Sequence, residues 1–257
     1  MSISFDRAAD IYDATRGFPA GVEALAAQTI ASAGGLRGGE RLLEIGVGTG
    51  RIALPLAAHV RQYVGVDIST SMMRRLQEKD GAGRVRLAQA DATRLPFAAD
   101  RFHAVVAVHV FHLIPGWRAV LEELRRVLLP AGCLIHCWNH NDQVIDIEAT
   151  LKAALGDEHG RADAVGARGT TFLEEAGWRA GDEQICAFTR LQKPVEIVDN
   201  MRQRVWSRTW RLSDAALAAA AAALQTALQE KFADLHAPVE VPTSFHAKAF
   251  YPPGAAA

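Results

Sequence analysis

The sequence Leu42-Leu-Glu-Ile-Gly-Val-Gly-Thr-Gly50 runs from a short apolar segment directly into a turn that has glycine at three alternate positions. Because glycine has no Cβ, this turn can bend sharply and let a ligand approach the backbone closely. Glu44 precedes the first glycine by two residues, and we expect its carboxylate at the mouth of the turn. A dinucleotide fingerprint, G-x-G-x-x-G, requires glycine where this chain has Arg51, and Glu44 would repel a pyrophosphate. The stretch therefore predicts a nucleoside-cofactor site whose ligand is cationic rather than anionic.

Composition limits the class of protein. The chain has 257 residues, of which 49% are hydrophobic, enough for one large α/β domain or for a core with a cap. Lys and Arg total 28 against 29 for Asp and Glu, so the net charge of −1 argues against nucleic acid or an anionic membrane as partner. The sequence shows neither an apolar run of about 18 residues nor a signal peptide, which predicts a cytoplasmic protein. The cysteines lack C-x-x-C spacing and are predicted to be buried thiols: Cys133, Cys137 and Cys186.

Strand and helix patterns alternate from residue 42 to residue 138. Short apolar runs predict strands, and apolar residues at helical spacing predict helices. The predicted strands are 42–45, 63–67, 85–90, 102–110 and 133–138, and the predicted helices are 51–59, 69–78 and 117–128. Such alternation is typical of a doubly wound parallel sheet.

After residue 138 the pattern changes. We predict a short helix at 171–177, a strand at 184–191 and a last strand at 243–251. The segment 195–235 has a long helical pattern, in which Ser213 can cap an alanine-rich helix. Three leucines of that helix share one face, which favours a packed helix over a low-complexity segment. We therefore predict a helical cap inserted before the last strand.

Two aspartates follow predicted strands. Asp67 ends the second strand, 21 positions after Gly46, where α/β nucleotide sites place an acid that binds both ribose hydroxyls. The alternative is that Asp67 caps the helix that begins near Ser69. Asp91 follows the third strand and could accept a hydrogen bond from an exocyclic adenine amine, although an ordinary turn aspartate explains it too.

Four motifs in this order resemble class I S-adenosylmethionine-dependent methyltransferases, closest to the branch of ubiquinone and menaquinone biosynthesis. They are the glycine turn, Val64-Gly-Val-Asp-Ile-Ser69, Ala90-Asp-Ala92 with Leu95-Pro-Phe97, and Arg125-Arg-Val-Leu-Leu-Pro-Ala-Gly132. The resemblance implies a single methyltransferase domain over 1–257, with a Rossmann-like doubly wound seven-stranded α/β sheet, mostly parallel with an antiparallel last strand. Its parts would be an N-terminal helical segment over the cofactor (1–35), a cofactor-binding core (36–141), a helical cap with one returning strand near 183–191 (142–240) and the final strand (241–251).

The resemblance also implies roles for individual residues toward S-adenosylmethionine and its product S-adenosylhomocysteine. The turn residues Gly46, Val47, Gly48 and Gly50 would lie under the methionine part, and Asp67 would hold the ribose. Adenine would be flanked by Ile68 and Met72 and met at its edge by Asp91 and Ala92, while His109 would lie along the cofactor. Glu44 would lie near the methionyl ammonium. Tyr12 and Arg16, four apart on one helical face, would reach the methionyl carboxylate or a substrate acid, although an ordinary exposed helix explains Arg16 nearly as well.

The acceptor side is predicted from the fourth and fifth strand ends. His109 and His112 lie at the carboxyl edge of the sheet, and His112 is the candidate general base, although a histidine that only bonds a loop fits equally. The His-x-x-His spacing without a third ligand predicts no metal site. The remaining predicted pocket residues are Trp138, Asn139, His140 and Trp206, of which Trp206 would share a helical face with Trp210 in a lid.

The predicted activity is in-line transfer of the sulfonium methyl to an oxygen, nitrogen or carbon of a small-molecule acceptor, by a monomer or homodimer. A non-catalytic binding module or assembly subunit that retains the cofactor site remains an alternative. An aminopropyltransferase would need an acidic polyamine site, which we do not find near the fourth strand. Arg51 disfavours a nicotinamide-dependent dehydrogenase.

Overall fold

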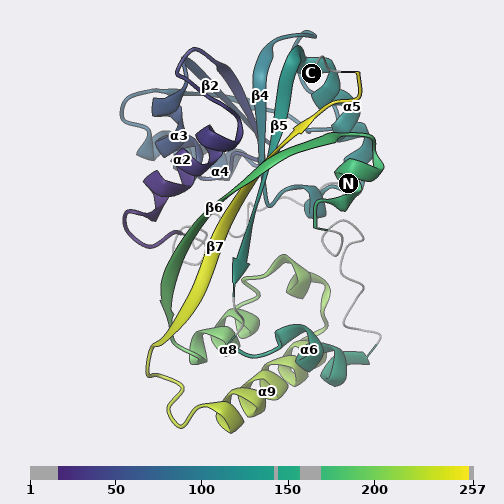
Figure 1. Cartoon of the computed structure of the whole chain (residues 1–257). Helices are drawn as coiled ribbons and strands as arrows, with labels where there is room; N and C mark the ends of the chain where they lie inside the picture. The colour runs from purple at the N-terminus through teal and green to yellow at the C-terminus, as the bar shows by residue number, and fades with distance from the viewer. Residues whose placement is uncertain (1–16, 142–143, 157–168, 255–257) are drawn as a thin grey trace. The chain divides into compact units, whose positions relative to one another are not determined.

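A single seven-stranded sheet organises the computed structural model, which describes residues 17–141, 144–156 and 169–254 (Figure 1). The strand order is β3-β2-β1-β4-β5-β7-β6. The strands are β1 (Arg41–Ile45), β2 (Gln62–Asp67), β3 (Val85–Gln89), β4 (Phe102–Val108), β5 (Leu128–Asn141), β6 (Arg179–Gln192) and β7 (Val239–Tyr251). The α-helices are α2 (Val22–Ala33), α3 (Ala53–Leu56), α4 (Thr70–Lys79), α5 (Trp117–Val127), α6 (Ile147–Leu155), α7 (Thr171–Glu175), α8 (Val195–Arg202) and α9 (Asp214–Lys231), and the short 3₁₀ turns include η2 (Ala57–His59), η3 (Phe111–Leu113) and η6 (Ser207–Arg211).

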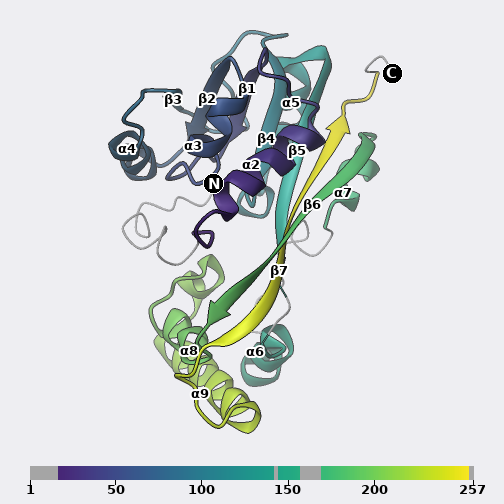
Figure 2. The ribbon, with the colours of Figure 1, turned by 60° about the vertical axis from the view of Figure 1, so that its left-hand side comes forward.

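The strand directions confirm the predicted fold class. β1 pairs in parallel with β2 and β4, β2 with β3, and β4 with β5. β7 runs opposite to both of its neighbours, as the arrowheads in Figure 2 show. The chain adds β2 and β3 on one side of β1 and then crosses to place β4 on the other side, so the direction of winding reverses about β1. The turn that follows Ile45 therefore lies at the topological switch point, where open α/β sheets bind ligands.

Helices cover both faces of the parallel part of the sheet. α2, α3 and α4 lie on one side and α5 on the other (Figure 1). The predicted cap at Ser213 is confirmed, because Ser213 Oγ accepts from Ala216 N at 3.1 Å. Ser69 caps α4 in the same way, since its Oγ accepts from Met72 N at 3.1 Å. The helix predicted at 51–59 is shorter than expected: it begins at Ala53 and tightens into η2.

The chain forms two compact units. The first comprises residues 1–139, 163–186 and 245–257, and the second comprises 140–162 and 187–244. The core of the first unit joins the buried faces of β1, β2 and β4 to α5 and α7, and includes Ile45, Val105, Leu124 and Phe172. All three cysteines are buried free thiols, as predicted.

The second unit packs α6, α8 and α9 around its own apolar core, which includes Leu151, Met201 and Leu224. The predicted continuous helix through Trp206 and Trp210 is wrong. Arg204 has a left-handed backbone (φ 54°), and its guanidinium donates to Thr209 O and Leu212 O. The indole of Trp210 donates to Arg204 O at 2.7 Å, so side-chain hydrogen bonds hold a non-helical turn and η6 here. No helix in the described parts of the chain has both the length and the apolar character needed to cross a membrane.

Candidate functional site

The glycine turn is fastened to the neighbouring strand and needs its glycines for two reasons. Gly46 N and Val47 N both donate to Val66 O of β2, at 2.8 and 3.0 Å. Gly46, Gly48 and Gly50 have φ of 69°, 56° and 83°, a region that L-residues with side chains disfavour. A Cβ on Gly50 would lie 2.6 Å from Leu76 Cγ, and one on Gly46 would lie 2.8 Å from Val110 Cγ2.

Gly48 differs from the other two. A Cβ there would meet only Met72 Cε at 3.5 Å and the carbonyl of Gly46 at 3.9 Å. The protein therefore leaves room above Gly48, where a ligand could contact the backbone. Met72 is 3% exposed and borders this room, whereas Ile68 is half-buried at the end of β2. This arrangement fits a nucleoside held between the turn and the start of α4.

Asp67 connects the turn with α4. Its Oδ2 accepts from Gly48 N at 2.9 Å, and its Oδ1 accepts from Ser69 N at 2.8 Å. Both carboxylate oxygens thus have a backbone donor, and the side chain is half-buried. A carboxylate oxygen has two lone pairs and can accept more than one hydrogen bond. Asp67 thus fastens the turn to the start of α4, whose cap is Ser69 and not Asp67. Its contact with the ribose stays a prediction.

Glu44 is placed differently from our expectation. Its side chain is 2% exposed, beneath the turn and not at its mouth, and the hydroxyl of Tyr63 donates to Glu44 Oε2 at 2.7 Å. The reason is that both faces of β1 are covered, so every residue from Leu42 to Ile45 is buried. Burial raises the pKa of Glu44 to about 8, while the Tyr63 hydrogen bond and the charge of Arg51 act in the opposite direction. Tyr63 was not among the predicted site residues, yet the β1–β2 register places it opposite Leu42, diagonal to Glu44.

The loop after β3 carries the two predicted adenine-edge residues. Asp91 is exposed, and its Oδ1 accepts from both Thr93 N and Thr93 Oγ1, at 2.9 and 2.8 Å. This is the turn geometry that we considered as the alternative, and it leaves Oδ2 available to a ligand. Ala92 is 7% exposed and packs into the core.

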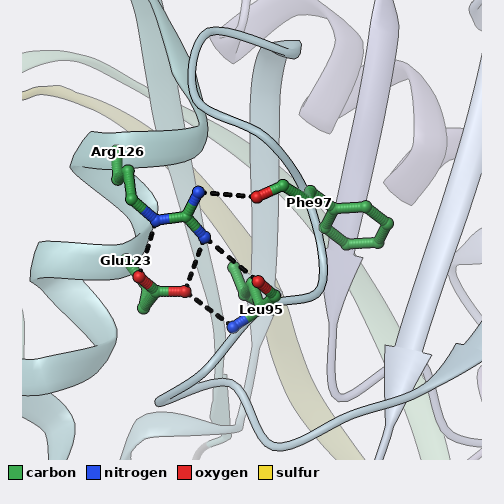
Figure 3. Close-up of polar contacts among 4 residues, drawn as sticks. All are labelled: Leu95, Phe97, Glu123 and Arg126. Atoms are coloured by element: carbon green, nitrogen blue, oxygen red, sulfur yellow. Dashed lines mark hydrogen bonds and ion pairs between the residues drawn. The ribbon is translucent and has the colours of Figure 1, made fainter.

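Arg126 of α5 holds the same loop in place (Figure 3). Its Nη1 donates to Phe97 O at 2.6 Å, and its Nη2 donates to Leu95 O at 3.0 Å. Glu123 accepts from Arg126 Nε and Nη2 and also from Leu95 N, at 2.7, 2.8 and 2.6 Å. The Arg126 hydrogen bond holds the pKa of Glu123 below its usual range. Two motifs that lie far apart in the sequence, 95–97 and 125–132, are thus parts of one network.

His109, just after β4, meets Asn139 near the carboxyl end of β5. β4 ends at Val108, one residue before His109, which has a left-handed backbone with φ of 49°. Its Nε2 lies 3.3 Å from Asn139 Oδ1, so two predicted site residues meet here. His112 lies on η3, half-buried, as predicted on the turn that follows the strand.

An aromatic cluster beside these histidines contains residues that the sequence did not reveal. His136 packs against Phe111, Phe172 and Trp138, with ring centroids 5.5, 5.9 and 5.5 Å away. Trp138 stacks on His246 at 5.2 Å, and His246 Nδ1 contacts Glu183 Oε1 at 2.5 Å. His136 Nδ1 is buried and has no hydrogen-bond partner among the described residues. Burial lowers the pKa of His136 to about 4, and nearby His112 acts in the same direction, so His136 is neutral near pH 7.

The other predicted residues are placed as follows. Tyr12 and Arg16 lie outside the described residues. His140 is exposed and belongs to the second unit. Trp206 also belongs to the second unit, where it packs against the apolar core. Among the residues that the structure describes, no three His, Cys, Asp or Glu side chains gather as a metal site would require.

Comparison with known proteins bears on this site. Residues 43–136 match the family model of the methyltransferase domain. A demethylmenaquinone methyltransferase of Clavibacter sepedonicus is 40% identical over 103 residues, which are 38% of this chain and 41% of that protein. A phosphatidylethanolamine N-methyltransferase of Cereibacter sphaeroides is 40% identical over 100 residues, 37% of this chain and 48% of that protein. The chain thus matches less than half the length of either relative.

Solved structures agree with this match at the level of the fold. The phosphoethanolamine N-methyltransferase 2 of Haemonchus contortus, solved with phosphomonomethylethanolamine and S-adenosylhomocysteine, aligns with a TM-score of 0.55 and 20% identity. The alignment covers 96% of this chain and 57% of that one. The matched segment contains the glycine turn, Asp67 and the Leu95–Phe97 loop, which surround the switch point of the sheet. Residues 43–136 are therefore similar to a methyltransferase domain, and the solved structures support the same fold.

Proposed function

We propose that this protein binds S-adenosylmethionine and transfers its methyl group to a small molecule. The observation that carries the proposal is the hydrogen bond from Gly48 N to Asp67 Oδ2 at 2.9 Å. It joins the glycine turn after β1 to the acid at the end of β2, at the switch point of the sheet. Gly48, where an added Cβ would meet no clash, and the buried Met72 beside it are consistent with a nucleoside in the same place.

The cofactor, when bound, supplies an electrophilic methyl group on a positively charged sulfur. The residues that would hold it are the turn 46–50, Asp67, Ile68, Met72, Asp91, Ala92 and His109, with Tyr12 and Arg16 from the N-terminal segment. Glu44 lies beneath the turn, where its charge responds to a nearby cation.

Methyl transfer asks chiefly that the acceptor be aligned with the methyl group and that water be excluded. Such alignment can contribute ~7–11 kcal/mol without a dedicated acid. We assign the acceptor side to His112, Trp138 and Asn139 of the first unit, with His112 as the group that takes a proton from the acceptor. The predicted roles of His140 and Trp206, which belong to the second unit, stay predictions. The names of both sequence relatives support a small molecule as acceptor, and their difference leaves its identity to experiment.

Calorimetric titration of S-adenosylmethionine into the full chain tests the cofactor site. Asp67→Asn keeps one oxygen for the backbone bonds and loses the charge, whereas Asp67→Ala loses both, so we expect binding to weaken in that order. The exposed Asp182→Asn is the matched control and should bind like the wild type. A nicotinamide dinucleotide should not bind. Equal binding by wild type and Asp67→Ala would refute the site.

A second experiment separates an enzyme from a non-catalytic binding module. The protein is incubated with methyl-labelled S-adenosylmethionine and a small-molecule extract, and both S-adenosylhomocysteine and labelled products are measured. Formation of labelled product by the wild type supports methyl transfer. A smaller amount of labelled product from His112→Gln supports the role of His112. Tight cofactor binding with no S-adenosylhomocysteine formed would favour the binding module.

A further inference from the structure

A cavity lies away from the cofactor turn, at the edge of the sheet where the parallel strands β2 and β3 begin. It has a volume of about 470 Å³ and lies between the start of β2 and the start of β3. Its lining includes Arg61, Arg84 and Arg86, with Gln62 and Tyr63 of β2.

The topology separates this cavity from the cofactor site. β1, β2 and β3 are parallel, so the amino ends of β2 and β3 share one edge and Asp67 lies at the other. Along β2, Gln62 and Asp67 are five residues apart, which corresponds to roughly 17 Å. A ligand in this cavity would therefore not occupy the predicted place of the cofactor.

The cavity has an unbalanced positive charge. All three arginines are exposed, and no acidic residue belongs to the lining. Arg61 Nε donates to Gly39 O at 3.4 Å, a long bond to a neutral group. Within the described residues, the guanidinium groups of Arg84 and Arg86 form no hydrogen bond or ion pair. The concentration of charge is local, because the whole chain has a net charge of −1.

The nearest acids are already used by the backbone. Asp80 accepts from Arg84 N and Val85 N, at 3.2 and 2.9 Å. Glu40 accepts from Arg37 N and Gly38 N, at 3.0 and 2.9 Å. These carboxylates shape the two loops beside the cavity and do not pair with its guanidinium groups.

We propose that this cavity binds a small molecule that carries a diphosphate or a comparable pair of anionic groups. Guanidinium groups bind phosphate oxygens in bidentate geometry, and three of them around one cavity suit two adjacent phosphates. The volume lies within the range of small-molecule pockets, about 300–1,000 Å³. The absence of a net positive charge on the chain disfavours a nucleic acid or an anionic membrane as occupant.

Inorganic pyrophosphate is the probe. It is titrated into the full chain at low ionic strength, with binding followed by calorimetry, for the wild type and for Arg84→Gln/Arg86→Gln. The double variant Arg125→Gln/Arg211→Gln removes the same charge from exposed positions outside the cavity and is the matched control. We expect saturable binding to the wild type and the control, and about tenfold weaker binding to the cavity variant.

Two results would overturn the proposal: no binding of pyrophosphate to the wild type, or equal binding to all three proteins. Binding of the wild type to phosphatidylglycerol vesicles is measured by sedimentation, and its binding to a single-stranded oligonucleotide is measured by titration. Binding to either of them in preference to pyrophosphate would also overturn it, in favour of a lipid headgroup or a nucleic acid. S-adenosylmethionine binding should be unchanged in the cavity variant, so this test succeeds or fails independently of the proposed methyl transfer.

Discussion

The hydroxyl of Tyr63 donates a hydrogen bond to Glu44 Oε2 at 2.7 Å, and the two side chains are 1% and 2% exposed. Burial raises the pKa of Glu44 to about 8 and that of Tyr63 above its usual range. Near pH 7 most molecules therefore carry a neutral Glu44 directly beneath a turn that we assign to a cationic ligand.

The first prediction concerns stability and pH. The pKa of Glu44 is about 8 in the folded protein against an ordinary value of 4.5, so the folded state holds this proton more tightly. Its contribution to stability is complete below pH 4.5 and is lost as pH rises to about 8, with a slope of up to about 1.4 kcal/mol per pH unit. Glu44→Gln should flatten the dependence of the free energy of unfolding on pH in this range. Urea denaturation at several pH values measures it, and an unchanged slope would contradict the raised pKa.

The second prediction links the same proton to the cofactor. A cation bound near Glu44 lowers its pKa, so binding of S-adenosylmethionine near pH 7 should release a proton, and affinity should rise from pH 7 to pH 8. Calorimetry in buffers of different ionisation enthalpy counts the protons released. Glu44→Gln should abolish the release and retain binding. Proton uptake by the wild type would show that Glu44 does not sense the ligand.

His136 provides the third prediction. Its buried Nδ1 lacks a partner, so His136→Phe, which keeps an aromatic ring among Phe111, Trp138 and Phe172, should raise the free energy of unfolding by about 1–3 kcal/mol. Because burial lowers the pKa of His136 from 6.5 to about 4, its contribution is full above pH 6.5 and is lost as pH falls toward 4. The variant should lose that acid sensitivity. The exposed His236→Gln is the control, and a destabilised His136→Phe would indicate a polar role for the imidazole.

The fourth prediction compares neighbouring arginines on α5. Arg126→Met removes four hydrogen bonds and leaves Glu123, 19% exposed, without its charged partner. The Arg126 side chain is 36% exposed, so solvent screening limits the expected loss to about 1–2 kcal/mol. The loop with Asp91 and Ala92 should loosen, and cofactor affinity should fall severalfold. The adjacent, exposed Arg125→Met should change neither quantity, and equal effects of the two variants would contradict the role of the network.

The fifth prediction separates backbone strain from packing in the glycine turn. Gly35→Ala meets open space at φ 60°, so it should cost only the left-handed penalty of about 1–2 kcal/mol. Gly50→Ala combines φ 83° with a Cβ 2.6 Å from Leu76 Cγ and should cost about 1–3 kcal/mol more. Chemical denaturation of both variants measures the difference, which would vanish if Leu76 could move aside freely.

Local sequence patterns were sufficient to predict the parallel sheet and the cap of α9 at Ser213. The apolar runs at 42–45 and 63–67 are bounded by glycine, aspartate or charged residues, and strand burial on both faces requires such runs. The helical pattern of 195–235 failed at Arg204 because its guanidinium bonds to Thr209 O and Leu212 O, which helix propensity does not include, hold a left-handed residue there.

The candidate site also contains residues that local spacing predicts and residues that it does not. The turn and Asp67 could be predicted because their spacing follows from one β-α-β unit. Tyr63, His136 and His246 could not, because their partners come from other strands and are known only once the register is known. The burial of Glu44 could have been deduced from the same reasoning, since a strand in the centre of a doubly wound sheet has no exposed face.

The packing of Gly50 against Leu76 bears on how this sequence could change over evolutionary time. A descendant that stopped using a nucleoside would still lose stability on replacing Gly50, because the constraint comes from the protein's own interior. Selection for stability would therefore retain this glycine in lineages whose chemistry had been lost or exchanged. Gly48 has the same left-handed backbone but no such clash, so a replacement there would cost the fold less and would be the earlier sign of a lost ligand.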